Sequence, residues 1–311
     1  LGLKEHPVIS PYGRDHHLAL SRGPVFGDTF RRLQHHDHRP GQIATRAPQG
    51  SSGYVRCVTR VSTQQRHYLT FWTGRTQALR AATSSVLPAW NDSLPGYASL
   101  LGMHAFALEE SGNHFGAEAI GREAVERNPN ALWAIHSVAH VLETQGRSAE
   151  GVAWFDYPTD AWDDRNPFRR HVWWCAALFN AAQGRYDNVL SLYDNVITSV
   201  NTPQNIDVQN LASLLARLEL RRVDIGDRWD ALAEHSETRI GDHDIVFNDI
   251  HWSLAMAAGG RTKAASHHAQ ATADFASTEP RWLRMSLPLL APTYAGVRSH
   301  GETRTMPRQP T

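Results

Sequence analysis

A glycine recurs along this chain at nearly regular intervals, and this periodicity restricts the possible folds more than any other feature. The intervals are 38, 34, 38, 42 and 34 residues, between Gly74, Gly112, Gly146, Gly184, Gly226 and Gly260. A helix-like apolar stretch precedes each glycine, and a small or aliphatic residue follows five positions later: Leu79, Ala117, Gly151, Val189, Ala231 and Ala265. A period near 34 residues with glycine at the turn is typical of stacked helical hairpins. We therefore predict an all-α fold, a right-handed α-solenoid.

Residues 97–127 form the clearest hairpin of the series and match the tetratricopeptide template. On the 34-residue scale of that repeat, Gly112 falls at position 15, Ala117 at 20, Ala124 at 27 and Pro129 at 32. Small residues at positions 20 and 27 allow the helices to approach closely, and the proline cannot continue a helix. The hairpins are therefore expected to be tetratricopeptide-like.

The composition divides the chain into three parts. Residues 1–66 are rich in His, Arg, Gly, Pro and Ser and show no sustained helical period, so we expect a poorly ordered or corrupted N-terminal segment. Residues 67–297 carry the helical period and form the repeat domain. Residues 298–311 are polar and contain two prolines, which is typical of a disordered tail.

The charge distribution and the apolar pattern argue against nucleic-acid and membrane partners. Residues 1–67 carry ten Lys and Arg against four Asp and Glu, and residues 298–311 carry three against one, although the whole chain has no net charge. The segment between them therefore has a net charge of −8 and would be repelled by phosphates. No window approaches the 18 or so apolar residues of a membrane span, and the first twenty residues hold no signal-peptide core. With only two cysteines, a cytoplasmic location is expected.

In a tetratricopeptide array the first helix of each hairpin lines the concave groove. His136, His140 and Glu143 lie at i, i+4 and i+7 in the second hairpin and so form one stripe on one helix. Glu109 has the equivalent groove-facing position in the preceding hairpin. Two histidines four apart can share a zinc ion, with Glu143 as a third ligand or a base. The alternative, which we favour, is a polar groove that binds a peptide, a protein or a small molecule without a cofactor.

Two further hairpins contain polar groups among apolar residues. His171 and Cys175 are four apart, and Cys175 with His136 and His140 would complete a zinc ligand set. Because tryptophans and alanines flank Cys175, a buried structural cysteine is the favoured interpretation. Asp249 and His251 follow Asn248, so this segment is either a helix N-cap or a polar group that faces the groove.

Several segments that depart from the repeat consensus are similar to the bacterial relatives of tetratricopeptide repeat protein 38. The strings are LPGYASLLGMHAFALEESG, ALWAIHSVAHVLETQGRSAEG, HVWWCAALF, SLLARLELRRVDIGDRW and FNDIHWSLA, within about residues 67–290. This chain has Cys175 where typical members resemble HLWWH, and Asn210 where they often carry an acid. The resemblance implies a helical-repeat fold and does not imply a particular reaction.

These observations predict a helical-repeat binding module whose concave groove recognises a peptide, protein or small ligand. The alternative function is an enzyme that uses a cluster of His, Asp and Glu in the groove, possibly for metal-assisted hydrolysis. The sequence contains no phosphate-binding glycine loop, dinucleotide fingerprint or nucleophile elbow.

Overall fold

The computed structural model describes residues 63, 66–67, 70–71, 75–156, 162, 166, 168–198, 205–243 and 246–278. Within these residues every regular element is a helix, which confirms the predicted all-α class. The described chain forms two compact units, one ending at Asn166 and the other comprising the residues from 167 onward. The expected tail at 298–311, the first glycine of the series, Gly74, and nearly all of the expected N-terminal segment lie outside the described residues.

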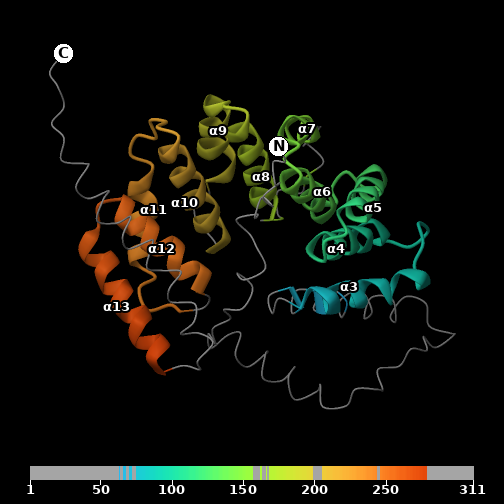
Figure 1. The fold of residues 1–311 in the computed structure, drawn as a ribbon, viewed down its shortest axis with the longest axis horizontal. Coiled ribbons are helices and arrows are strands. Elements are labelled where there is room, and N and C mark those ends of the chain that lie inside the picture. Colours follow the sequence, from blue (N-terminus) through green and yellow to red (C-terminus); the bar gives the residue numbers. More distant parts are fainter. Residues whose placement is uncertain are drawn as a thin grey trace, which may run out of the picture. The chain divides into compact units, whose positions relative to one another are not determined.

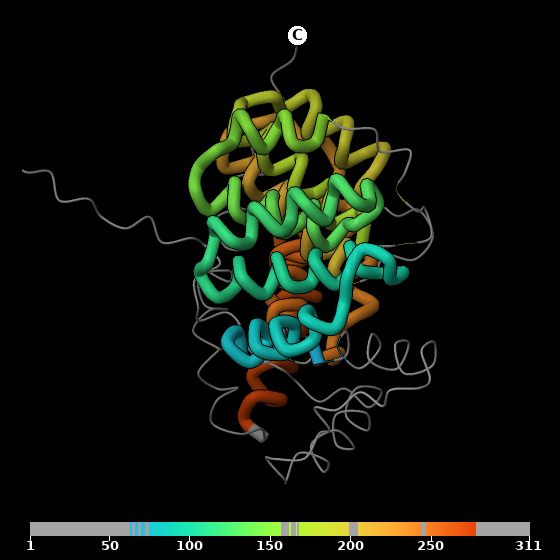
Figure 2. The backbone as a smooth tube through the Cα atoms, turned by 90° about the vertical axis from the view of Figure 1, so that its right-hand side faces the viewer, coloured from blue at the N-terminus to red at the C-terminus, as the bar shows by residue number. Residues whose placement is uncertain are grey.

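The first unit consists of short helices that pack against their neighbours in the chain. These are α3 (Thr76–Ser84), the 3₁₀ turn η1 (Leu87–Ala89), α4 (Tyr97–Glu110), α5 (His114–Arg127), α6 (Leu132–Thr144) and α7 (Ser148–Trp154). Helix α4 contacts α3, α5 and α6, and α6 also contacts α5 and α7 (Figure 1). The chain therefore runs back and forth in successive layers (Figure 2). The small residues Ala117 and Ala124 are fully buried in this packing, as their repeat positions predict.

The second unit repeats the same construction. Its elements are α8 (Phe168–Ala182), α9 (Tyr186–Leu192), the π-helical turn η3 (Tyr193–Ile197), α10 (Asn205–Leu220), α11 (Trp229–Glu237), α12 (Val246–Ala258) and α13 (Thr262–Thr278). Helix α10 packs against α8, α11 and α12, and α13 packs against α12 (Figure 1). Two large side chains of its core, Trp229 and Trp252, are almost completely buried.

The recurring glycines end the first helix of each hairpin in a left-handed backbone conformation. Gly112 has φ +83°, its N–H donates to Glu109 O at 2.8 Å, and the next N–H, of Asn113, donates to Leu108 O at 2.8 Å. This pair of bonds is the Schellman arrangement, which satisfies carbonyls that the helix leaves without partners. Gly146, Gly184 and Gly260 also have positive φ values, and the residue after each donates the same long-range bond.

The fourth described hairpin does not turn at Gly226, and that prediction is wrong. Arg222 has the left-handed φ of +60°, its N–H donates to Glu219 O, and Val223 N–H donates to Leu218 O at 3.0 Å. Gly226 lies in the longer connection that leads into α11, so Ala231 falls on the exposed side of that helix and Ala233 is buried instead. With Arg222 in place of Gly226, the turn residues are 34, 38, 38 and 38 positions apart.

Candidate functional site

The first helices of the hairpins (α4, α6, α8, α10 and α12) carry most of the polar side chains singled out from the sequence. In the first unit His136 and His140 both lie on α6, and their ring centroids are 4.0 Å apart. His136 is buried and stacks on Phe106 of α4 at 5.6 Å and 27°. Trp133 packs edge-on against both rings. His136 therefore belongs to an aromatic cluster, whereas His140 lies at its edge, with its side chain 32% exposed.

His140 lies beside the two acids that end α4. Its Nδ1 is 3.5 Å from Glu109 Oε2, and one ligand atom from each of Glu109, Glu110 and His140 lies within 4.8 Å of the others. The side chain of Glu109 is only 10% exposed. Burial and the neighbouring charge of Glu109 raise the pKa of Glu110 to about 7, against the opposing effect of His140. These three residues form the acidic cluster of the first unit.

The charge balance of this cluster also affects His140. Burial alone would lower the pKa of its imidazole, but the contact with Glu109 and the charges of Glu109, Glu110 and Glu143 together raise it. Glu143, the third residue of the predicted stripe, is itself exposed, and the structure groups His140 with Glu110 instead. Glu110 was not predicted from the sequence as a site residue. The one sequence feature that could have indicated it is its position next to Glu109 at the end of the helix.

In the second unit the first helices are joined by polar side chains. Arg170 on α8 forms two hydrogen bonds of 2.9 Å with the carboxylate of Asp207 on α10, and the Asp207 side chain is completely buried. One residue further along α8, His171 Nδ1 is 3.0 Å from Asn210 Oδ1. The His171 ring stacks on Trp174, with centroids 5.2 Å apart. The predicted site residue His171 is thus held between an amide and an aromatic ring.

Cys175 lies one turn after His171 on α8 and is buried, as the surrounding tryptophans and alanines predict. It belongs to the second unit, whereas His136 and His140 belong to the first.

The N-cap interpretation of the segment around Asp249 is wrong. Helix α12 begins at Val246, so Asn248 and Asp249 are inside its first turn, where both side chains are buried. Asn248 Oδ1 accepts a short hydrogen bond from Gln209 Nε2 of α10. These two amides extend the polar contacts of α8 and α10 to α12.

Asp249 lies between two histidines that the sequence reasoning did not select. Its Oδ1 is 3.0 Å from His243 Nδ1 and 3.3 Å from His268 Nε2, and His268 is fully buried on α13. His251 faces another direction, because its Nδ1 donates to Phe247 O at 2.7 Å. Burial lowers the pKa of His251 to about 4, with an opposing effect from the Phe247 bond and a further lowering by Arg217.

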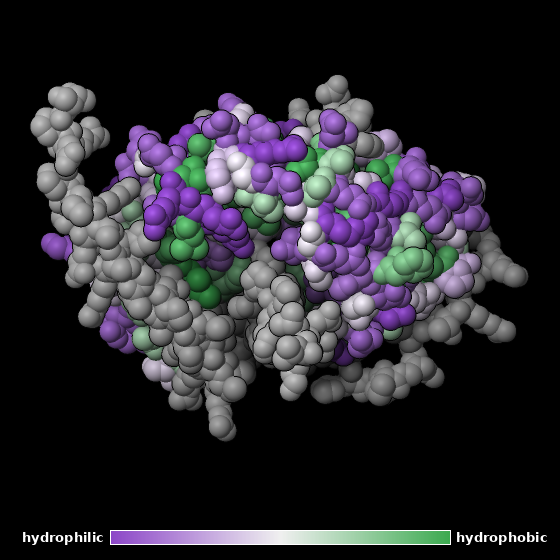
Figure 3. All heavy atoms as spheres, turned by 45° about the horizontal axis from the view of Figure 1, so that its top comes forward, coloured by the Kyte–Doolittle hydropathy of each residue, from purple (hydrophilic) through white to green (hydrophobic). Residues whose placement is uncertain are grey.

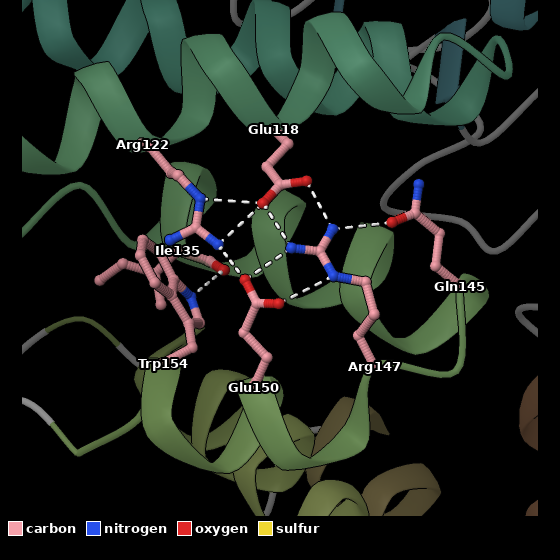
Figure 4. A network of polar contacts seen from close by, with 7 residues as sticks. All are labelled: Glu118, Arg122, Ile135, Gln145, Arg147, Glu150 and Trp154. Carbon is pink, nitrogen blue, oxygen red and sulfur yellow. Dashed lines mark hydrogen bonds and ion pairs between the residues drawn. The ribbon is translucent and has the colours of Figure 1, made fainter.

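Away from the first helices, the first unit carries a network of ion pairs between α5 and the α7 region. Arg147 and Glu118 approach to 2.7 Å, and Arg122 contacts both Glu118 and Glu150 at 2.8 Å (Figure 4). The Arg122 guanidinium also lies 4.8 Å from the ring centroid of Trp154. The hydrogen bond from Arg147 holds the pKa of Glu118 at about 2, against the effect of burial and with help from Arg122. A shallow hollow beside this network is lined by Arg122, Val125, Glu126, Pro129 and Trp154.

A scan against protein-family models finds none that matches this chain. Among the described helices, none has the length and apolar character required to cross a bilayer. On the face that Figure 3 shows, hydrophilic residues cover much of the described surface and apolar residues form separate patches. Within its described residues the protein thus combines an all-helical fold with polar first helices.

Proposed function

We propose that this chain is an α-solenoid of tetratricopeptide-like hairpins that acts as a binding module. Its turn residues recur at 34 and then 38 positions, which is the period of a helical repeat. Within each unit a first helix packs against the next first helix, as α4 does with α6 and α10 does with α8 and α12. This packing supports a repeat array in which the first helices share a face.

The observation that carries the proposed function is the set of polar contacts between the first helices of the second unit. Arg170 with Asp207, His171 with Asn210 and Gln209 with Asn248 are pairs separated by 37, 39 and 39 residues, close to one repeat. Each contact fixes the orientation of a polar group before any ligand arrives. A preorganised polar surface loses less conformational entropy on binding than a flexible one.

The ligand best suited to such a surface is a peptide segment of another protein, with a small polar molecule as the alternative. Helical repeat arrays offer an extended surface along which a peptide can lie, and polar groups set the register of the peptide. His171 and Arg170 are only partly buried, so both can still contact a ligand. The module is expected to bind its ligand without a cofactor and to have no affinity for nucleic acids or membranes.

Selection from a displayed library of random peptides on the full chain tests this function. We expect a peptide family to be enriched, with affinity at least tenfold weaker for His171→Ala, because the substitution removes a polar contact and a ring. The matched control is Asp187→Ala, on the exposed side of the second helix α9, which should leave the affinity within about twofold. Thermal melting of each variant establishes that the fold is retained. Absence of any enriched peptide, or equal loss in both variants, would contradict the proposal.

A further inference from the structure

We propose that Glu109, Glu110 and His140 form a binding site for a divalent transition-metal ion in the first unit. The three residues come from the end of α4 and the middle of α6, and their ligand atoms lie within 4.8 Å of one another. This inference does not rest on the proposed peptide-binding function, because it concerns a different unit and a different ligand.

The spacing of the two best-defined atoms suits a shared ion. Zinc binds histidine nitrogen and carboxylate oxygen at about 2.1 Å, so two such ligands at a tetrahedral angle are about 3.4 Å apart. Nδ1 of His140 and Oε2 of Glu109 are 3.5 Å apart, which is longer than a strong hydrogen bond. An ion could therefore bridge these two atoms with very little movement of either helix.

The burial of Glu109 provides an independent reason to expect a cation. Its side chain is nine-tenths buried, and its Oε2 accepts no geometrically acceptable hydrogen bond from the described residues. Among those residues its ion-pair partner is His140, and neither Lys nor Arg pairs with it. A buried carboxylate oxygen without a hydrogen bond is costly, and a bound metal ion satisfies it directly.

The electrostatic environment of the cluster favours the same ligand. Two adjacent carboxylates end helix α4, where the helix dipole contributes further negative potential. Glu109 is nine-tenths buried and the carboxylate of Glu110 lies close to it, so water compensates this negative potential poorly. A divalent cation would offset both carboxylate charges.

The ligand types identify the class of metal. One imidazole nitrogen and two carboxylate oxygens suit Zn²⁺, Mn²⁺ or Fe²⁺ better than the all-oxygen ions Ca²⁺ and Mg²⁺. His140 remains about one-third exposed, which gives the ion a route from solvent. Three protein ligands leave at least one coordination position open for water, as in catalytic rather than structural zinc sites.

Titration calorimetry of the full chain with Zn²⁺, after treatment with a chelator, tests the site. The variants are Glu109→Gln and His140→Gln, each of which removes one ligand and nearly preserves side-chain volume. The matched control is Glu143→Gln, which removes an exposed negative charge one turn from His140 on the same helix. Histidines elsewhere in the chain can also bind zinc, so the decisive quantity is the difference between variants.

We expect the wild-type chain to bind one equivalent of Zn²⁺ at this site. The affinity of Glu109→Gln and of His140→Gln for that equivalent should be at least tenfold weaker. Zn²⁺ should raise the melting temperature of the wild type and of Glu143→Gln, but not of the two ligand variants. Melting curves of the metal-free proteins verify that all of them fold. The proposed site would be overturned by identical zinc binding in all four chains or by no binding to the wild type. It would also be overturned if Glu143→Gln lost as much zinc affinity as the two ligand variants. Peptide selection on metal-free protein remains informative in each case.

Discussion

The two units differ in how their buried carboxylates and amides are satisfied. In the second unit Asp207, Asn248 and Asp249 are buried, and each contacts a polar side chain from another helix or from the segment that precedes α12. In the first unit the ion pairs of Arg122 and Arg147 are partly exposed (Figure 4). Among the described residues, the buried acid Glu109 has only a long contact with His140. Polar burial therefore orients the helices of the second unit and fixes the partly buried Arg170 and His171 beside them. In the first unit it leaves the Glu109 carboxylate oxygen available for a cation.

This difference has an energetic consequence. A buried ion pair contributes little net stability as a whole, because desolvation offsets the attraction, but removal of one partner leaves a buried charge without compensation. A partly exposed pair can replace a lost partner with water, so its removal costs little. Equivalent substitutions in the two units should consequently have unequal effects.

The largest expected effect is that of Arg170→Met in the second unit. The substitution leaves the buried Asp207 carboxylate without its bidentate partner and should lower the free energy of unfolding by about 3 kcal/mol. The matched change in the first unit, Arg122→Met, should cost less than about 1 kcal/mol, because its partners are partly exposed. Urea denaturation followed by circular dichroism measures both.

The double variant Arg170→Met, Asp207→Leu separates loss of charge compensation from loss of packing. It removes the stranded carboxylate together with its partner, and it should recover most of the stability lost in Arg170→Met. If the two arginine variants cost the same, or if the double variant is no better than the single one, the proposed difference between the units fails.

The dependence of stability on pH should be of intermediate size. The two units should differ in the pH range over which stability is lost. His251 in the second unit titrates near its usual value of 6.5 when unfolded but at about 4 when folded, because burial disfavours the imidazolium. The unfolded state therefore binds more protons between these values, and stability is full above pH 6.5 and falls as the pH drops towards 4. The full shift corresponds to about 3 kcal/mol at most.

Glu118 in the first unit gives a smaller effect at lower pH. Its pKa falls from 4.5 unfolded to about 2 folded, so its contribution is present above pH 4.5 and is lost between 4.5 and 2. Since solvent screens this pair, about 1 kcal/mol is expected. Unfolding free energies measured at pH 7.5, 5 and 3 for wild type, His251→Gln and Glu118→Gln test both ranges. A His251→Gln curve parallel to the wild type above pH 4 would contradict the assignment.

The smallest predicted effect concerns the turns. Arg222 occupies the left-handed position that glycine holds at the described turns of the first unit, Gly112 and Gly146. Arg222→Gly should stabilise the protein by about 0.5–1 kcal/mol, because relief of the side-chain strain exceeds the added entropy of the unfolded chain. The neighbouring Arg221→Gly, at an ordinary backbone conformation, should be destabilising instead. Thermal melting measures the change in melting temperature of each variant. Changes of the same sign in both variants would rule out this interpretation of the turn.

Much of the helical fold could be predicted from local sequence signals. Gly112, Gly146, Gly184 and Gly260 end helices as predicted, because a residue without a Cβ adopts the left-handed conformation without strain. The fourth turn could not be placed in this way, since Arg222 has no local preference for that conformation and only the packing of α10 and α11 imposes it. The turn was predicted at Gly226 because glycine adopts the left-handed conformation easily. The presence of a glycine does not show at which residue packing requires that conformation.

The candidate site was predictable only in part. The stripe of His136 and His140 followed from helical geometry, and the two histidines indeed lie together on α6. Their different environments did not follow, because burial of His136 depends on Phe106 and Trp133 from two helices. The partners of Asp249, His243 and His268, are six and nineteen residues away in the sequence. The periodicity of one helix cannot predict contacts at these separations.

The sequence by itself determined the helical class, the approximate period and which residues lie on the same face of one helix, because these depend on interactions within a few residues. Tertiary structure alone decided which polar groups became buried and which partner each obtained. Burial depends on neighbouring helices from distant parts of the chain, and the pKa of a carboxyl or imidazole group depends on that burial. For this reason the sequence predicted a groove position for Glu109 and no role for Glu110, whereas in the structure both form an acidic cluster with His140.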